Sequence, residues 1–354
     1  MGGVVFLTGF PGFIAGRLLK RLAQDGQRFI LLVQPALVED ALKEISDIAR
    51  QTNRDLRDFQ IAVGDITQPD LGLNPDDARI IREEANVVFH LAAIYDLAVA
   101  RDIALRVNFE GTRNVNKFVR TLLNLKHYHY ISTCYVAGKR KGVILEKELR
   151  HDAGFRNHYE ESKYLAELEV ERLKDDVPLT IHRPAVVCGD SQTGETAKYD
   201  GVYYLINYLL KAPRLLSILN IGNDAVTLNL VPVDFVVDSF AALATDTEAL
   251  GKTLQLADPE PLTTRQLFNS IAESLCRRTA LITVPAWMVE FSLMLPPSPA
   301  ITGLPHHGVP YFFVRQSYDS TEAQRILKRH GITCPPFKSY VENIVAYAAK
   351  HQVI

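Results

Sequence analysis

The sequence contains few of the features that mark a secreted, metal-binding or nucleic-acid-binding protein. Its four cysteines are widely scattered (Cys134, Cys188, Cys276 and Cys334), and none has the paired spacing of a zinc site or a redox dithiol. The 41 acidic and 39 basic residues leave a net charge of -2, which provides no basic excess for nucleic acid. We therefore expect reduced thiols, no metal site and no nucleic-acid partner.

Long apolar segments are also scarce. The most membrane-like run, residues 284–295, is too short to span a bilayer and contains Glu290. Residues 1–3 lead directly into an apolar strand, which leaves no room for the charged and apolar regions of a signal peptide. These features predict a cytoplasmic protein without a membrane span.

The first 190 residues alternate short apolar strands with amphipathic helices. Strands are expected at residues 4–8, 29–33, 60–63, 87–90, 127–132 and 179–182. Because helical patterns separate them, the strands should be parallel, and the fold class should be α/β with a Rossmann-type doubly wound sheet. A strand at 227–230, followed by a helix at 234–243, is expected to return to that sheet.

The pattern changes beyond Gly189. A polar, turn-rich segment precedes an apolar helix expected at 203–216, prolines interrupt residues 285–310, and a last helix is expected at 339–350. We expect a dinucleotide-binding domain from residues 1–189 plus about 226–257. Residues of about 190–225 plus 258–354 would form a smaller, mostly helical substrate lobe.

The turn after the first strand has the pattern Gly9-x-x-Gly12-x-x-Ala15 and opens a helix. Gly9 permits a tight turn, Gly12 lets the backbone approach a phosphate, and the small Ala15 lets helix and strand pack closely. The helix N-terminus then offers free N–H groups and a positive dipole to a pyrophosphate. In this context the pattern predicts a dinucleotide-binding site.

The end of the second strand distinguishes the two nicotinamide dinucleotides. A carboxylate there would bind the adenosine ribose, whereas a basic residue would bind the 2′-phosphate of NADP. The chain has Gln34, which is neither, and Glu39 and Asp40 come several residues later. Because no acid stands at this position and Arg17 lies in the first helix, we expect NADP(H) to be favoured over NAD(H).

Tyr159 and Lys163 are four residues apart on a predicted helix, so their side chains share one face. An adjacent ammonium lowers the pKa of a phenol, which suits general acid–base chemistry at neutral pH. A second pair at this spacing, Tyr135 and Lys139, straddles a glycine at a strand end and is not expected to share a helical face. Thr133 would supply the hydroxyl that holds a substrate carbonyl.

Further motifs follow in order between residue 4 and about residue 240. The matching segments are Thr8-Gly9-Phe10-Pro11-Gly12-Phe13-Ile14-Ala15, Gly64-Asp65-Ile66, His90-Leu91-Ala92-Ala93, Val107-Asn108-Phe109-Glu110-Gly111-Thr112, Ser132-Thr133, Tyr159-x-x-x-Lys163 and Arg183-Pro184-Ala185-Val186-Val187-Cys188-Gly189-Asp190. With them the chain resembles an extended short-chain dehydrogenase/reductase, and within that superfamily the thioester-reductase and fatty acyl-CoA reductase (male sterility) group.

The resemblance implies roles for particular residues. Asp65 and Ile66 would flank the adenine, Ala92 and Ala93 would line the cofactor channel, and Asn108 would brace the sheet or relay a proton. The implied catalytic residues are Thr133, Tyr159, Lys163 and Asn108. The implied cofactor contacts are Thr8, Gly9, Phe10, Pro11, Gly12, Phe13, Ile14, Gln34, Asp65, Ile66, Leu91, Ala92, Ala93, Lys163, Pro184 and Val186. The group usually carries an arginine where this chain has Gln34.

These observations predict an NAD(P)(H)-dependent oxidoreductase that transfers hydride to or from the carbonyl of a hydrophobic acyl thioester, aldehyde or ketone. The 354 residues include no carrier or adenylation domain, so a carrier- or CoA-bound substrate would be delivered from elsewhere to a monomer or homodimer. Two other enzymes stay open, an NAD-dependent sugar-nucleotide epimerase or dehydratase and a 3β-hydroxysteroid dehydrogenase-like enzyme. A non-catalytic dinucleotide-binding redox sensor is a third alternative.

Overall fold

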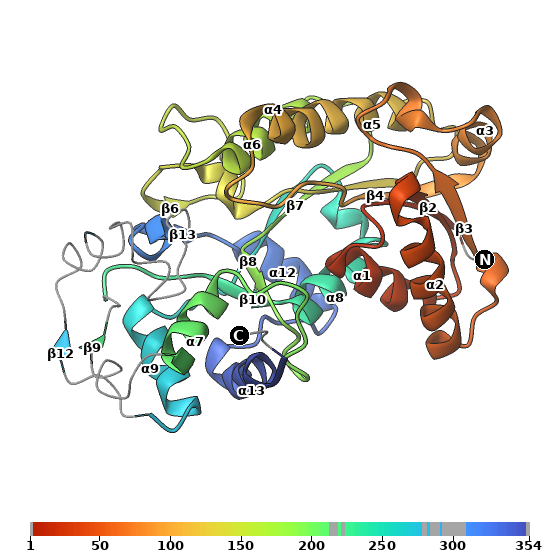
Figure 1. Ribbon diagram of the computed structural model, residues 1–354. Coiled ribbons are helices and arrows are strands. Elements are labelled where there is room, and N and C mark those ends of the chain that lie inside the picture. The colour runs from red at the N-terminus through yellow and green to blue at the C-terminus, as the bar shows by residue number, and fades with distance from the viewer. Residues whose placement is uncertain are drawn as a thin grey trace.

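The computed structural model describes residues 3–211, 219–220, 224–277, 282–283, 291 and 309–351. Seven parallel strands form its main sheet in the order β11-β7-β5-β4-β1-β2-β3 (Figure 1). These strands are β1 (Val4–Thr8), β2 (Arg28–Val33), β3 (Phe59–Val63), β4 (Ala85–His90), β5 (His127–Ile131), β7 (Leu179–Pro184) and β11 (Thr253–Leu256). The order is that of a doubly wound Rossmann sheet, which confirms the expected fold class.

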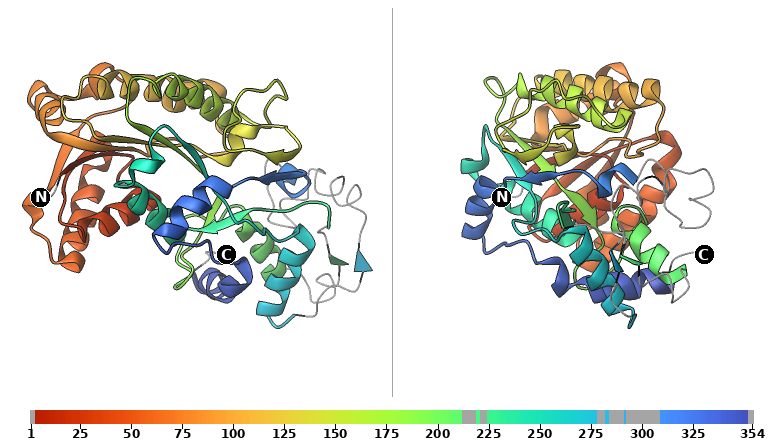
Figure 2. Two further views of the ribbon diagram at one scale, coloured as in Figure 1. Left: turned by 180° about the vertical axis from the view of Figure 1, so that it is seen from behind. Right: turned by 90° about the vertical axis from the view of Figure 1, so that its left-hand side faces the viewer.

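Helices cover both faces of the sheet, as the front and rear views show (Figures 1 and 2). Val5 and Leu7 of β1 pack into one core, while Val4 and Phe6 pack into the other. The first face is covered by α1 (Phe13–Ala23), α2 (Val38–Thr52), α8 (Val233–Leu243) and α12 (Thr321–Arg329). The second is covered by α3 (Pro75–Glu84), α5 (Gly111–Val119) and α6 (His158–Glu171), with the short α4 (Arg101–Ala104) beside α6. Because both faces are buried, β1 and β2 are apolar almost throughout, as Val4–Thr8 and Arg28–Val33 show.

The expected return to the sheet at residues 227–230 is wrong. The strand there is β10 (Leu230–Pro232), and it pairs with β8 (Val186–Cys188) in a separate two-stranded sheet. The seventh strand of the main sheet is β11, which pairs with β7 and was not expected from the sequence. Its four residues alternate polar and apolar types, a weak pattern for a strand that is buried along its whole length.

A third core lies beside the end of the sheet. It contains side chains of α7 (Val202–Lys211), α9 (Thr264–Ser274) and α13 (Val341–His351), together with β8 and β10. Two minor pairs complete the strands, β6 (Gly142–Ile144) with β13 (Gln316–Tyr318), and β9 (Leu219–Asn220) with β12 (Ile282–Thr283). The apolar run 284–295, except for Phe291, and most of the proline-rich segment lie outside the described residues. The expected domain boundaries stay a prediction.

The expected absence of a membrane span and of a metal site can be compared with the described residues only. No helix within them is both long enough and apolar enough to span a bilayer. Across the same residues, no group of three histidine, cysteine or acidic side chains is arranged to hold a metal ion.

Three histidines are stacked in the interior between β5 and β7. His129 Nδ1 lies 2.9 Å from His182 Nε2, and His127 Nε2 lies 2.7 Å from the Thr180 hydroxyl. Burial lowers the pKa of His127 to about 4 and that of His182 to about 3. Burial, together with the two neighbouring imidazoles, holds the pKa of His129 well below its usual value. The cluster is therefore neutral at pH 7.

Stability should decrease in mild acid because of this cluster. The folded-state pKa values lie below the usual value of 6.5, so below that pH the unfolded chain binds protons that the folded chain does not. Each histidine should then cost about 1.4 kcal/mol of unfolding free energy per pH unit. The measurement is denaturant unfolding between about pH 7 and pH 5. His129→Gln should reduce the slope of unfolding free energy against pH by about the contribution of one histidine. The control His158→Gln, at an exposed position, should leave that slope unchanged. Equal slopes in the two variants would contradict the prediction.

Candidate active site

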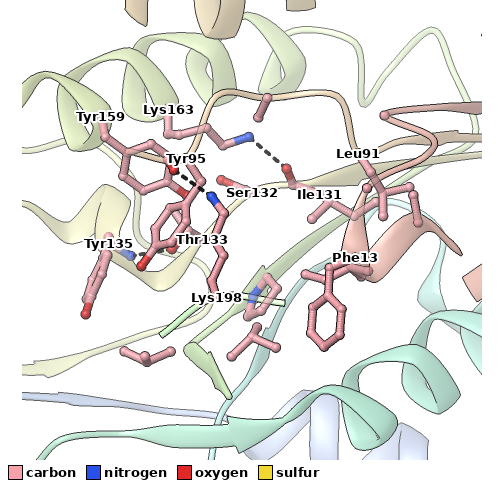
Figure 3. A pocket seen from close by; sticks show the side chains of 18 of the residues that line it. Phe13, Leu91, Tyr95, Ile131, Ser132, Thr133, Tyr135, Tyr159, Lys163 and Lys198 are labelled. Atoms are coloured by element: carbon pink, nitrogen blue, oxygen red, sulfur yellow. Dashed lines mark hydrogen bonds between the residues drawn. The ribbon is translucent and has the colours of Figure 1, made fainter. Parts of the chain in front are cut away.

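A cavity of about 310 Å³ opens at the carboxyl ends of β1, β4, β5 and β7 (Figure 3). In a doubly wound sheet this edge is where ligands bind. The structure brings these expected site residues together in its wall: Gly9, Gly12, Phe13, Ile14, Leu91, Ala93, Thr133, Tyr159, Lys163, Pro184 and Val186. Residues more than 170 positions apart in the chain thus face one space.

The glycine turn is shaped by close backbone contacts. Gly9 has a φ of +92°, and a Cβ there would lie 2.7 Å from the backbone nitrogen of Ala92. A Cβ on Gly12 would lie 2.6 Å from the Gly9 carbonyl oxygen, which accepts a hydrogen bond from the Gly12 N–H. No side chain caps the start of α1 at Gly12. The turn therefore presents bare backbone and a helix N-terminus to the cavity, which fits a pyrophosphate.

Lys163 projects from α6 towards the end of β5 (Figure 3). Its ammonium donates to the Ile131 carbonyl oxygen at 2.8 Å and to the Tyr130 hydroxyl at 3.0 Å. Burial lowers the pKa of Lys163 to about 7, and the nearby Glu167 carboxylate opposes that shift. Two of the three ammonium donors are thus used to fix the side chain, which leaves one for a ligand.

Tyr159 lies on the same helix and faces the cavity beside Thr133 (Figure 3). Its ring packs edge-on against Tyr95, with centroids 5.1 Å apart. Burial raises the pKa of Tyr159 above its usual value, and the Thr133 side chain opposes that shift. The pKa of Tyr159 therefore lies above its usual value in place of the lowering expected from Lys163, and the phenol is protonated at neutral pH.

A buried polar network holds this arrangement in place. Glu167 accepts hydrogen bonds from Arg183 of β7, whose Nε lies 2.8 Å away, and from the Ser132 hydroxyl. Arg183 also donates to the carbonyl oxygens of Glu146 and Glu148. Because Ser132 is held by Glu167, the adjacent Thr133 is the hydroxyl next to Tyr159. The assignment of Thr133 as the hydroxyl that holds a substrate carbonyl stays a prediction.

Asn108 is buried within a π-helix (Leu105–Glu110), away from the cavity wall. Its Oδ1 accepts from the Ile94 N–H at 2.8 Å, and its Nδ2 donates to the Ser162 hydroxyl at 3.0 Å. Ser162 in turn donates to the Tyr159 carbonyl oxygen. Asn108 therefore braces the loop after β4 against α6.

Other expected cofactor residues lie below or beside the cavity wall. Thr8 is buried, and its hydroxyl binds His90 Nδ1 at 2.8 Å and the Ala92 N–H at 3.2 Å. Phe10 is buried in the core, and Pro11 lies in the turn itself. Gln34 and Asp65 lie at the ends of β2 and β3, where Gln34 Nε2 donates to Asp65 Oδ2 at 3.2 Å. The neighbouring Ile66 is buried, and a Cβ on Gly111 would lie 2.7 Å from its side chain.

Sequence reasoning missed the opposite wall of the cavity, which is lined by Tyr95, Tyr135, Thr196, Lys198 and Asp200. Lys198 extends across the space and donates to the Tyr95 carbonyl oxygen at 3.0 Å (Figure 3). Four of them come from loops without a periodic pattern, whereas Tyr135 lies in a short 3₁₀-helix (Cys134–Ala137). Only the position of Tyr135, two residues after Thr133, offered a signal. Lys139 is exposed, so the alternative Tyr135–Lys139 pair does not face the cavity together.

Comparison with known proteins identifies a matching family and several relatives. Residues 7–240 match the family model described as male sterility protein. "Fatty acyl-CoA reductase wat" of Drosophila melanogaster is 26% identical over 279 residues, 68% of this chain and 54% of that protein. "Glycine betaine reductase ATRR" of Emericella nidulans is 24% identical over 285 residues, 75% of this chain but 22% of that protein. The chain thus spans about half or less of these relatives.

Solved structures share the fold. The terminal R domain from the myxalamid PKS-NRPS biosynthetic pathway has a TM-score of 0.84 at 24% identity, covering 99% of this chain and 92% of that one. A thiolation-reductase di-domain from an archaeal non-ribosomal peptide synthetase has a TM-score of 0.77 at 20% identity, covering 99% and 76%. The family model covers well over half of the sequence. The chain therefore belongs to the male sterility protein family.

Proposed function

We propose that this protein is a nicotinamide-dinucleotide-dependent reductase of the carbonyl group of a hydrophobic substrate, with an acyl thioester favoured over an aldehyde or ketone. The observation that carries the proposal is that Thr133, Tyr159 and Lys163 share one cavity with the glycine turn after β1. Relatives named as fatty acyl-CoA reductases and a solved thiolation-reductase di-domain support a CoA- or carrier-bound thioester.

The residues of the cavity fit a nicotinamide dinucleotide. The bare turn from Gly9 to Gly12 and the uncapped start of α1 suit its pyrophosphate, and the free donor of Lys163 suits a ribose hydroxyl. When bound in its reduced form, the dinucleotide supplies the hydride for the carbonyl carbon. The expected contacts at Leu91, Ala93, Pro184 and Val186 would line its channel.

The chain's own residues manage the proton. Because burial keeps the Tyr159 phenol protonated, its hydroxyl can donate a proton to the carbonyl oxygen as negative charge develops there. The Thr133 hydroxyl orients that oxygen, and the Lys163 ammonium stabilises the phenolate that Tyr159 leaves behind. With a thioester, one hydride and one proton give a hemithioacetal, which releases a thiol and leaves an aldehyde.

The expected preference for NADP(H) depended on Gln34 and Arg17. The Arg17 guanidinium lies 2.8 Å from Asp190 and 2.7 Å from Glu195, so its charge is already paired. Arg17 therefore no longer supports the expected preference for NADP(H).

Nucleotide-sugar turnover with tightly held NAD would favour the epimerase alternative instead. A cytoplasmic location and a monomeric or homodimeric state stay predictions.

Tyr159→Phe should abolish most of the activity without loss of cofactor affinity. Removing a general acid typically costs about 10²–10⁴-fold in rate, while the phenyl ring keeps the packing against Tyr95. The measurements are thioester-dependent dinucleotide oxidation and dinucleotide binding by calorimetry. Tyr164→Phe, the same change on the same helix away from the cavity, should retain turnover. Wild-type turnover in Tyr159→Phe would disprove the assignment.

The activity should decrease as pH rises through about 7. The pKa of Lys163 is lowered to about 7 by burial, so the ammonium is present below that pH and lost above it. The proposed role needs the charged form, so kcat/KM measured from about pH 6 to pH 9 should fall on the alkaline side. Lys163→Arg stays charged throughout, and its weaker activity should lack this fall. A wild-type profile that rises above pH 7 would contradict the proposal.

A further inference from the structure

Tyr311 is a buried tyrosine of the C-terminal segment that lies against the first turn of α6. It belongs to a short 3₁₀-helix (Val309–Phe312), and only 8% of its surface is exposed. Its hydroxyl donates to Glu160 Oε1 at 2.6 Å and accepts from Asn157 Nδ2 at 2.7 Å. Asn157 is the N-cap of α6, and its side chain accepts from the Glu160 N–H. Tyr311 is therefore tied to the end of the helix that carries Tyr159.

Glu160, the main partner of Tyr311, follows Tyr159 directly in the chain and is completely buried. Its carboxylate also accepts from the Arg156 backbone N–H at 2.9 Å and from the Arg156 guanidinium at 3.0 Å. That guanidinium lies over the Tyr311 ring, 5.5 Å from the ring centroid. Burial, with the Glu160 carboxylate beside it, raises the pKa of Tyr311, so the phenol is protonated and serves as a donor. A buried carboxylate needs such donors, which fixes the Tyr311 side chain in place.

The Tyr311 ring also contacts the segment that follows Thr133. It packs on the Tyr135 ring, with centroids 4.6 Å apart. The Tyr135 side chain lines the cavity, and its N–H donates to the Thr133 hydroxyl at 3.2 Å. The Arg156 guanidinium donates to the Gly138 carbonyl oxygen at 2.6 Å, just beyond the same short helix. One buried side chain thus contacts both segments that carry the two hydroxyls of the site.

We infer that Tyr311 is a positioning residue for the reaction, which holds the hydroxyls of Tyr159 and Thr133 in the relative placement that a substrate carbonyl oxygen needs. The inference rests on the proposed function. Tyr311 acts through Asn157 and Glu160 on one side and through Tyr135 on the other. Such placement matters because a displacement of about 1 Å at a reacting group can cost about a hundredfold in rate. The C-terminal segment thereby contributes to catalysis through the geometry of α6.

The test is Tyr311→Phe, which removes the hydroxyl and keeps the ring against Tyr135. In thioester-dependent oxidation of NADH or NADPH, kcat should fall by about tenfold or more, because Tyr159 and Thr133 are no longer held in register. KM for the thioester should change less than kcat, and the dissociation constant of the dinucleotide, measured by calorimetry, should change by less than about twofold. This split is expected because the glycine turn and Lys163 keep their own contacts.

Two further variants separate positioning from a general loosening of the fold. Tyr128→Phe is the matched control, since it removes another buried hydroxyl, which donates to Asn116 at 3.0 Å, and it should keep the wild-type kcat. In a Tyr159→Phe background the phenol no longer acts, so adding Tyr311→Phe should lower the residual kcat by no more than about threefold.

The outcomes also separate this inference from the proposed function. Wild-type kcat in Tyr311→Phe would overturn the inference and leave the proposed function in place, whatever the stability of the variant. An equal fall of kcat in Tyr128→Phe, or the full tenfold fall in the Tyr159→Phe background, would overturn it in the same way. A wild-type protein that oxidises neither dinucleotide with any thioester, aldehyde or ketone would overturn both.

A second variant applies if Tyr311→Phe does not fold. Asn157→Ser keeps a side-chain oxygen that can cap α6 but removes the amide that donates to the Tyr311 hydroxyl. Its kcat should fall by about threefold, with dinucleotide binding unchanged. Wild-type kcat in Asn157→Ser would then overturn the inference.

Discussion

Arg183 of β7 and Glu167 of α6 form an ion pair that is almost completely removed from water, and the placement of the site depends on it. Glu167 lies one helical turn beyond Lys163 and also holds Ser132, while Arg183 ties the loop at residues 146–148 to the sheet. Removing one partner of such a pair typically costs about 3–5 kcal/mol, because the other charge is left buried without compensation. The pair therefore fixes α6, and with it Tyr159, against the ends of the strands.

Exclusion of water determines the pKa values of the groups that this ion pair holds in place. Burial lowers the pKa of Lys163 to about 7 and raises that of Tyr159, so both shifts favour the uncharged forms. Lys163 donates a hydrogen bond to the Tyr130 hydroxyl. His90, also buried, is hydrogen-bonded to the hydroxyls of Thr8 and Thr112. The pKa of His90 is lowered to about 3 by burial and by the lysine, so this imidazole is neutral. The Lys163 ammonium is thus a charge of the cavity wall that titrates near neutral pH.

The N-terminal half of the fold was readable from the sequence because strands buried on both faces tend to be apolar runs, as residues 4–7 and 29–33 are. The six strands expected there exist, with ends shifted by no more than two residues. The seventh was missed because Thr253–Leu256 is short and alternates like a half-exposed strand. Its burial comes from β7, Glu146 and α12, which are distant in the chain.

The sequence by itself determined the glycine turn, the Tyr159–Lys163 helical face and the strand end at Thr133, because each depends on neighbours within a few residues. The tertiary structure alone decided which of these groups meet and what charge they carry. It placed Asp65 against Gln34, paired Arg17 with Asp190, and brought Lys198 and Tyr95 to the far wall. Burial and pairing of charges are properties of the packed chain, since they arise between segments that only folding brings together.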